Sequence, residues 1–294
     1  MTDFVWLSAN EFGFKLLEQV LALQDPEINI RGVITLRPDA RTVMYDGVPP
    51  DDWNRFGIEV AFIDRIEKDG AEVLRAWAPD HVVMAGWRQI VPAEVLDIPR
   101  RGFVSFHPTK LPYGRGPAPL INQILAGVED SAMSLMYTDD GVDSGDLIGQ
   151  GPFQIGPDDH AEDVYAKIVA QGVALGIKHL PQLARGNAPR LAQSSDDAVV
   201  FPKPSRANWI DLGESLQSTY ARIRALSRPY RGAHLEDGLG FRLVVWRARP
   251  TLTPRGTLIQ PGVGFEAHRD RPQDLYFSDG TEHLQVVEGE IKSK

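Results

Sequence analysis

The sequence contains no cysteine, and this absence removes several kinds of chemistry at once. No disulfide, thiolate nucleophile or cysteine-ligated metal can form. The seven histidines show neither a His-x-His nor a His-Glu-x-x-His spacing, so no metal site is predicted. A chain without cysteine fits a reducing compartment, and we expect a cytoplasmic protein.

Other features are missing as well. No apolar run is long enough to span a bilayer, and no basic segment followed by a long apolar one indicates a signal peptide. The chain lacks a phosphate-binding Gly-x-x-x-x-Gly-Lys-Ser/Thr loop, a Gly-x-Gly-x-x-Gly turn after the first strand and a Gly-x-Ser-x-Gly elbow. The formal net charge of −9 has the wrong sign for attraction to nucleic-acid backbones. We therefore expect neither a membrane nor a nucleic-acid partner.

The first part of the chain alternates short apolar runs with helical patterns. Such alternation predicts βαβ units and a mostly parallel, Rossmann-like sheet with helices on both faces. The stretch 37–57 is rich in Pro, Asp and Gly and is predicted to be a loop. The predicted strands are 4–7, 30–35, 60–63, 81–85 and 102–106, and the predicted helices are 14–23, 71–78 and 92–96.

The second part predicts a smaller, β-rich domain. Because the 294 residues exceed the usual length of one domain, we divide the chain into a large domain 1–190, a linker 191–207 and a C-terminal domain 208–294. Helices are predicted at 118–125, 160–183 and 215–226, and strands at 131–137 and 147–155. Short strands at 241–248, 256–259, 262–267, 274–277 and 283–287 predict a small OB-like barrel.

Two polar features carry the candidate chemistry. His107 ends an apolar run, and Pro108 prevents that strand from continuing, so His107 should lie at a strand end where α/β sheets bind ligands. The alternative is a structural histidine with its hydrogen bonds satisfied. The second feature is the acidic loop Asp-Asp-Gly-Val-Asp-Ser-Gly-Asp (139–146), in which Asp143 could simply cap a turn.

These two features together resemble a known family. Ser-Phe-His-Pro-Thr-Lys-Leu-Pro-Tyr-Gly-Arg-Gly (105–116) and Gly-Val-Asp-Ser-Gly-Asp (141–146) look like the formyltransferases that use N10-formyltetrahydrofolate. Their motif is Asn-x-His-Pro-Ser-Leu-Leu-Pro, followed by an Asp in a Leu-Asp-x-Gly loop. Residues 208–211 and 223–233 resemble the start of the second domain of the tRNA and sugar enzymes. The resemblance implies that 1–190 is the catalytic domain, with His107 stabilising the oxyanion and Asp143 assisting His107 and proton removal.

One position departs from the family motif. Ser105 stands where the family carries Asn, and a serine hydroxyl is shorter than the amide and rotates. Positions 105 and 107 share one face of an extended strand, so Ser105 still points towards the site and is a third catalytic candidate. The alternative reading is a non-catalytic relative that binds folate or a nucleotide sugar.

The resemblance also implies where the substrates bind. From residue type alone, Trp87 fits a core position as well as a contact to the pterin ring. Arg88 and Lys110 fit a solvated surface position as well as a contact to the acceptor. No metal is implied. N10-formyltetrahydrofolate would lie against two loops, with candidates Met84, Gly86, Trp87, Ile90, Val91, Thr138, Asp139, Asp140 and Gly141, and the acceptor would contact Arg88, Lys110, Tyr113 and Arg115.

The acceptor is predicted from charge. The tRNA enzymes usually carry a basic insertion after the second strand, but here the segment 36–52 has two Arg against four Asp. Residues 205–294 are nearly neutral, with 13 Lys and Arg against 11 Asp and Glu. Both features disfavour tRNA, whose binding would depend on phosphate contacts. We expect a nucleotide-linked amino sugar. The alternatives are methionyl-tRNA and another small amine, and the resemblance suggests a homodimer.

Overall fold

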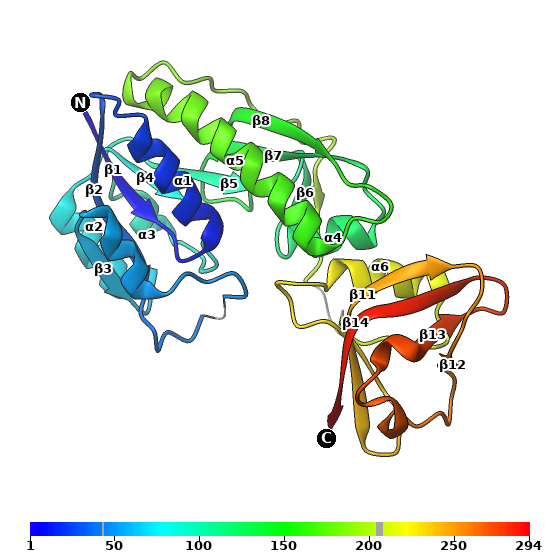
Figure 1. The fold of residues 1–294 in the computed structure, drawn as a ribbon. Helices are drawn as coiled ribbons and strands as arrows, with labels where there is room; N and C mark the ends of the chain where they lie inside the picture. Colours follow the sequence, from blue (N-terminus) through cyan, green and yellow to red (C-terminus); the bar gives the residue numbers. More distant parts are fainter. Residues whose placement is uncertain (43, 204–207) are drawn as a thin grey trace. The chain divides into compact units, whose positions relative to one another are not determined.

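The computed structural model describes residues 1–42, 44–203 and 208–294 (Figure 1). These residues form two compact units, each assembled from three stretches of the chain. The predicted domain limits 1–190 and 208–294 stay a prediction, and residues 204–207 of the predicted linker 191–207 lie outside the described residues. The first unit comprises Met1–Gly116, Asp130–Phe153 and Lys167–Val200, and the second comprises Pro117–Glu129, Gln154–Ala166 and Phe201–Lys294.

The first unit is built on a seven-stranded sheet in the order β3-β2-β1-β4-β5-β7-β8. The pairings among the first five strands of this order are parallel, whereas β7 is antiparallel to β5. Apart from the edge strand β3, whose Phe62 is 38% exposed, the apolar runs of the parallel strands are largely buried, as expected for a sheet covered on both faces. The strands are β1 Thr2–Leu7, β2 Ile28–Leu36, β3 Val60–Ile63, β4 His81–Met84, β5 Phe103–His107, β7 Asp130–Tyr137 and β8 Leu147–Gln154.

Helices cover both faces of this sheet, which confirms the predicted fold class (Figure 1). Val5 and Leu7 pack in one cluster with Leu74 of α2 (Ala71–Trp77) and Val95 of α3 (Ala93–Leu96). The alternate residue Trp6 faces the other side, where its indole donates a hydrogen bond to the Gly13 carbonyl of α1 (Glu11–Ala22). Alternation along β1 therefore places one helix layer on each face.

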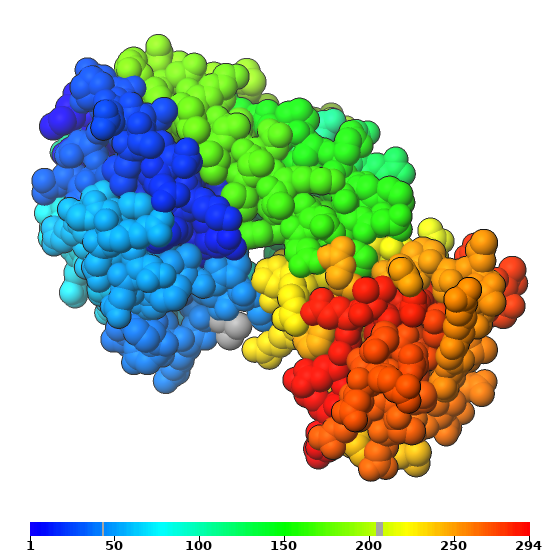
Figure 2. Space-filling view, viewed as in Figure 1, coloured from blue at the N-terminus to red at the C-terminus, as the bar shows by residue number. Residues whose placement is uncertain are grey.

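Helix α1 lies beside the long helix α5 (Ala161–Ala184) on its face of the sheet (Figures 1 and 2). Two glycines of α5 permit this close approach, because a Cβ atom at Gly172 would meet Phe12 and one at Gly176 would meet Leu16. Helix α1 begins three residues before the predicted start. The reason is Asn10, whose side chain accepts a hydrogen bond from the Gly13 amide and caps the helix.

The stretch 37–57, predicted to be a loop, contains a 3-10 helix over Pro50–Phe56. Its Trp53 is fully buried and meets Phe14 edge to face, with ring centres 5.0 Å apart. The prediction was wrong here because one buried aromatic in so short a helix produces no periodicity. Burial of that single ring fixes the helix instead.

The second unit contains a five-stranded sheet in the order β10-β11-β14-β13-β12, which confirms the predicted β-rich C-terminal region. Residues 262–267 were predicted to be a strand, but Gly262 has φ of +87° and Glu266–His268 form a 3-10 helix. The elements are α4 Pro119–Leu125, α6 Leu216–Ala225, β10 Ala233–Glu236, β11 Phe241–Thr251, β12 Thr257–Leu258, β13 Leu275–Ser278 and β14 His283–Ser293.

Part of the predicted linker is bound into the first unit. Strand β9 (Val199–Val200) pairs with β6 (Tyr113–Arg115), and Leu191 exchanges two backbone hydrogen bonds with Leu147, of 2.8 and 3.0 Å. The chain thus runs from the end of α5 back to the loop that follows His107. Within the described part of the chain, no helix combines the length and the apolar character that a membrane crossing requires.

Candidate active site

His107 is the last residue of β5, and its side chain is buried. Its Nε2 lies 2.8 Å from the carbonyl oxygen of Gly114. Because a carbonyl only accepts hydrogen bonds, Nε2 carries a hydrogen and donates it. The other nitrogen, Nδ1, lies 3.5 Å from Oδ2 of Asp143. The structure therefore brings the two predicted catalytic residues together, with Nδ1 on the side of the carboxylate.

Asp143 lies in the loop between β7 and β8 in the left-handed region, with φ of +48°. Its Oδ2 also accepts a hydrogen bond of 2.8 Å from the Gly116 amide. The turn-capping role falls instead to Asp139, which accepts hydrogen bonds from the Gly141 amide and the Ser144 hydroxyl of its own loop. Asp143 thus reaches out of its loop to the segment that follows His107.

Ser105 is buried, and it lies on the same face of β5 as His107. Its Oγ accepts a hydrogen bond of 3.0 Å from the Thr138 hydroxyl. The Thr138 amide donates to the carbonyl of Phe103, so Thr138 is fastened to β5 at two points. A hydroxyl that accepts one hydrogen bond keeps its own hydrogen for another acceptor. Ser105 therefore retains a donor on the face that carries His107.

Arg115 lies between two glycines with positive φ, Gly114 at +82° and Gly116 at +92°. Its Nε and Nη2 both donate to Oε1 of Gln193, at 3.1 and 2.8 Å. The guanidinium predicted to contact the acceptor is therefore bound to a protein side chain. Sequence reasoning missed Gln193, because it lies in a polar stretch without periodicity or motif. Only the pairing of that stretch with β6 and β8 brings it to the site.

The last residue of β4 and the loop that follows it contain the first group of predicted folate contacts. Met84, Trp87 and Val91 are half-buried and pack against the core cluster of α2 and α3, which favours the core reading of Trp87. Gly86 has φ of +69°, and a Cβ atom there would meet the Asn10 side chain. Ile90, in contrast, is 90% exposed. Of this group, Ile90 presents the most accessible apolar surface.

Most of the remaining predicted residues lie at the surface. Arg88 donates to Asp46 at 3.2 Å and lies over the Tyr45 ring, so its guanidinium takes part in surface contacts. Lys110 is exposed, and Tyr113 is 38% exposed in β6. In the other loop, Thr138 is half-buried, and the remaining predicted residues Asp139, Asp140 and Gly141 are exposed.

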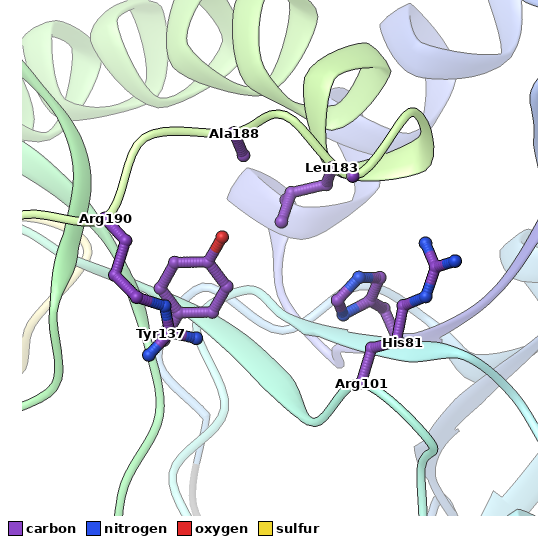
Figure 3. A pocket seen from close by; sticks show the side chains of 7 residues that line it. His81, Arg101, Tyr137, Leu183, Ala188 and Arg190 are labelled. Carbon is purple, nitrogen blue, oxygen red and sulfur yellow. The ribbon is translucent and has the colours of Figure 1, made fainter.

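None of these predicted residues lines a cavity of about 390 Å³ (Figure 3). His81 and Arg101 lie on one side of it and Tyr137 and Arg190 on the other, and Leu183 of α5 also lines it. Tyr137 pairs with Val104, whose side chain points to the opposite face of β5 from His107. The cavity thus belongs to the α5 face of the sheet. Among the residues that the structure describes, no cluster of His, Asp and Glu could hold a metal ion.

Comparisons with known proteins agree with the motifs. Residues 21–180 match the family model described as formyl transferase. The methionyl-tRNA formyltransferase of Halorhodospira halophila is 34% identical over 185 residues, which are 63% of this chain and 59% of that protein. The chain thus spans less than two thirds of that relative. The methionyl-tRNA formyltransferase of Geobacillus thermodenitrificans is 30% identical over 233 residues, 76% of this chain and 71% of that protein.

Two solved structures share the fold. One is an N-formyltransferase from Helicobacter canadensis in complex with folinic acid and dTDP-3-aminofucose, with a TM-score of 0.70 and 18% identity over 97% of this chain and 99% of that chain. The other is the methionyl-tRNA formyltransferase from Clostridium thermocellum, with a TM-score of 0.64 and 18% identity over the whole of both chains. At such identities the likeness establishes the fold alone.

Proposed function

Because the chain belongs to the formyltransferase family, we propose that it transfers a formyl group from N10-formyltetrahydrofolate to the primary amine of a small acceptor. The observation that carries the proposal is the approach of the Asp143 carboxylate to Nδ1 of His107, at the carboxyl end of a parallel strand. Ligands bind at this end of the strands in open α/β sheets.

The reaction needs a donor at the formyl oxygen and an acceptor for the amine proton. The amine nitrogen forms a bond to the formyl carbon and loses a proton, the bond from that carbon to N10 breaks, and N10 takes up the proton that the amine released. Since Nε2 of His107 is engaged by Gly114, Nδ1 is the nitrogen available to the oxygen that becomes anionic. In the imidazolium form Nδ1 donates to that oxygen, and one such donor contributes about 3–4 kcal/mol. Asp143 compensates the imidazolium charge and receives the amine proton, directly or through water.

Ser105 supplies a second donor to the formyl oxygen in this proposal. The Thr138 hydroxyl donates to Ser105 Oγ and thereby restricts the rotation of the serine side chain. The hydrogen of Ser105 then takes the place of the amide that the family motif carries at this position. The alternative, a relative that binds its ligands without turnover, would follow if this donor fails to reach the substrate.

For the co-substrate we propose a position between the loop 84–91 and the loop 138–143. Each loop exposes an apolar side chain, since Ile90 is 90% and Val142 59% exposed. Exposed apolar residues next to backbone polar groups suit a planar pterin ring, which needs both kinds of contact. No metal enters this proposal.

As the acceptor we propose a nucleotide-linked amino sugar. The acidic net charge and the short acidic stretch after β2 support a small acceptor rather than a tRNA. The Helicobacter canadensis protein, which shares the fold, was solved with a nucleotide-linked amino sugar. Methionyl-tRNA is the second candidate acceptor, because the sequence relatives at 30–34% identity are named methionyl-tRNA formyltransferase. The cytoplasmic location and the homodimer stay predictions.

Mass spectrometry tests the proposal. The protein is incubated with N10-formyltetrahydrofolate and, separately, nucleotide-linked 3- and 4-amino sugars or methionyl-tRNA. We expect a sugar to gain one formyl group with the unaltered protein and with the control Asp97→Asn, an exposed carboxylate outside the site. His107→Ala and Asp143→Asn should abolish the product. Formylation of methionyl-tRNA but of no sugar would overturn the proposal that the acceptor is an amino sugar. Folate binding without product from any amine would support the non-catalytic alternative.

A further inference from the structure

The Gln193 side chain uses both ends of its amide group. Oε1 accepts two hydrogen bonds from Arg115, and Nε2 donates to the backbone carbonyls of Asp143 and Gly145, at 3.0 and 2.7 Å. This orientation of the amide is unambiguous, because a guanidinium only donates and a carbonyl only accepts. Nε2 also donates to Sδ of Met136 in β7, at 3.9 Å. One half-buried side chain therefore joins the Arg115 segment to the Asp143 loop and the strand that precedes it.

Those two segments are the ones that fix His107. Gly114 and Gly116 flank Arg115. The Gly114 carbonyl accepts a hydrogen bond from His107, and the Gly116 amide donates one to the Asp143 carboxylate. Gln193 bonds to the side chain of Arg115 and to the backbone of Asp143. The contacts thus form a closed ring from His107 through Gly114, Arg115, Gln193 and Asp143 back to His107.

The backbone on both sides of Gln193 is itself anchored. Leu191 is paired with Leu147, and the Val199 amide donates to the Pro112 carbonyl at 3.2 Å. The side-chain amide of Gln193 is therefore attached to a backbone that is held in place on both sides. Its contact with the Asp143 carbonyl also holds that residue in the left-handed conformation, which only a few residue types other than glycine adopt readily.

From this ring of contacts we propose that Gln193 is a positioning residue, which holds the Asp143 loop and the Arg115 segment at the spacing that brings the Asp143 carboxylate to His107. The assignment rests on the formyl transfer proposed above. Gln193 acts through Asp143, so its loss should slow the chemical step and leave the binding of both substrates nearly unchanged. A misplacement of about 1 Å at a reacting group lowers a rate by about a hundredfold.

The test compares three proteins: the unaltered protein, Gln193→Glu and Ser194→Ala. Gln193→Glu keeps an oxygen for Arg115 but sets a second acceptor against the carbonyls of Asp143 and Gly145. Ser194→Ala is the matched control, because this exposed neighbour lies in the same segment. We expect kcat to fall between about tenfold and a hundredfold in Gln193→Glu, with both KM values within about twofold, and no change in the control.

Two further measurements separate positioning from folding and from the proposed function. Gln193→Ala should lower kcat while its thermal midpoint stays close to that of Ser194→Ala; a kcat that is unchanged, or that falls only as folded protein is lost, overturns the proposal. The 15N NMR signal of His107 Nδ1 needs no turnover. If the unaltered protein forms no product, the proposed formyl transfer is wrong. A shifted Nδ1 signal in Gln193→Ala would still support the positioning role of Gln193. An unshifted signal would overturn that role.

Discussion

The two ends of the parallel sheet each carry a buried histidine, and their surroundings differ. His107 closes β5 at the carboxyl end, with a carbonyl on one ring nitrogen and the Asp143 carboxylate near the other. His81 opens β4 at the amino end, where it stacks on Phe4 and burial lowers its pKa. Burial of a histidine therefore does not distinguish a candidate catalytic residue from a structural one. The distinguishing feature is a carboxylate from another segment of the chain, which lies beside His107.

The largest expected effect separates these two histidines. His107→Ala should lower kcat for formyl transfer by about a thousandfold, because the donor to the oxyanion is lost. His81→Ala should leave the kcat of the folded protein within about twofold and lower its thermal midpoint, because it removes a buried stacked ring. Steady-state rates together with thermal melts check both. Equal losses of kcat would contradict the contrast.

The next effect concerns the carboxyl end alone. Ser105→Ala should lower kcat by about a hundredfold, since it removes the second donor and leaves Thr138 without the acceptor of its hydroxyl. Ser105→Asn places the family's amide at this position and should raise kcat above that of the unaltered protein. The measurement is formyl transfer under saturating substrates. Activity of Ser105→Ala equal to that of the unaltered protein would remove Ser105 from the mechanism.

A smaller effect concerns the stability conferred by the amino end. Burial, the largest cause, lowers the pKa of His81 below its ordinary value of 6.5, so the unfolded chain binds the proton first as the pH falls. The free energy of unfolding should therefore decrease as the pH drops below about 6.5. His81→Phe, which keeps a ring against Phe4, should reduce this dependence. Urea unfolding at pH 7 and pH 5 checks the change, and an unaltered dependence would contradict it.

The smallest expected effect on kcat and KM is that of a substitution in the lining of the cavity in Figure 3. Arg101 lines that cavity on the α5 face of the sheet, and neither Ser105 nor His107 lines it. Arg101→Ala should therefore leave kcat and both KM values within about twofold. Steady-state kinetics with both substrates measure this. A KM raised in Arg101→Ala would show that the cavity contributes to substrate binding.

Local sequence patterns were sufficient for most of the first unit. Each parallel strand carries a short apolar run, and Pro108 follows β5 at His107, so strand positions and the strand-end histidine were both predictable. The long helix α5 was predicted within one residue at each end. These features depend on neighbours in the sequence, which is why one sequence suffices to find them.

The features that were missed depend on contacts between distant segments. The sequence does not show which aspartate of the loop 139–146 caps the turn and which reaches His107, because all four carry the same group. Gln193 has no local signal, since its partners lie about 50 and 80 residues away. The strand predicted at 262–267 failed because a glycine with positive φ turns the backbone there.

The pairing of β9 with β6 has a practical consequence for protein engineering. A fragment trimmed at residue 190, the predicted end of the large domain, would leave out both β9 and Gln193. Such a fragment would keep His107, Asp143 and Ser105 but lose the segment that ties Arg115 to the Asp143 loop. The boundary for transplanting this site onto another scaffold therefore lies beyond Val200.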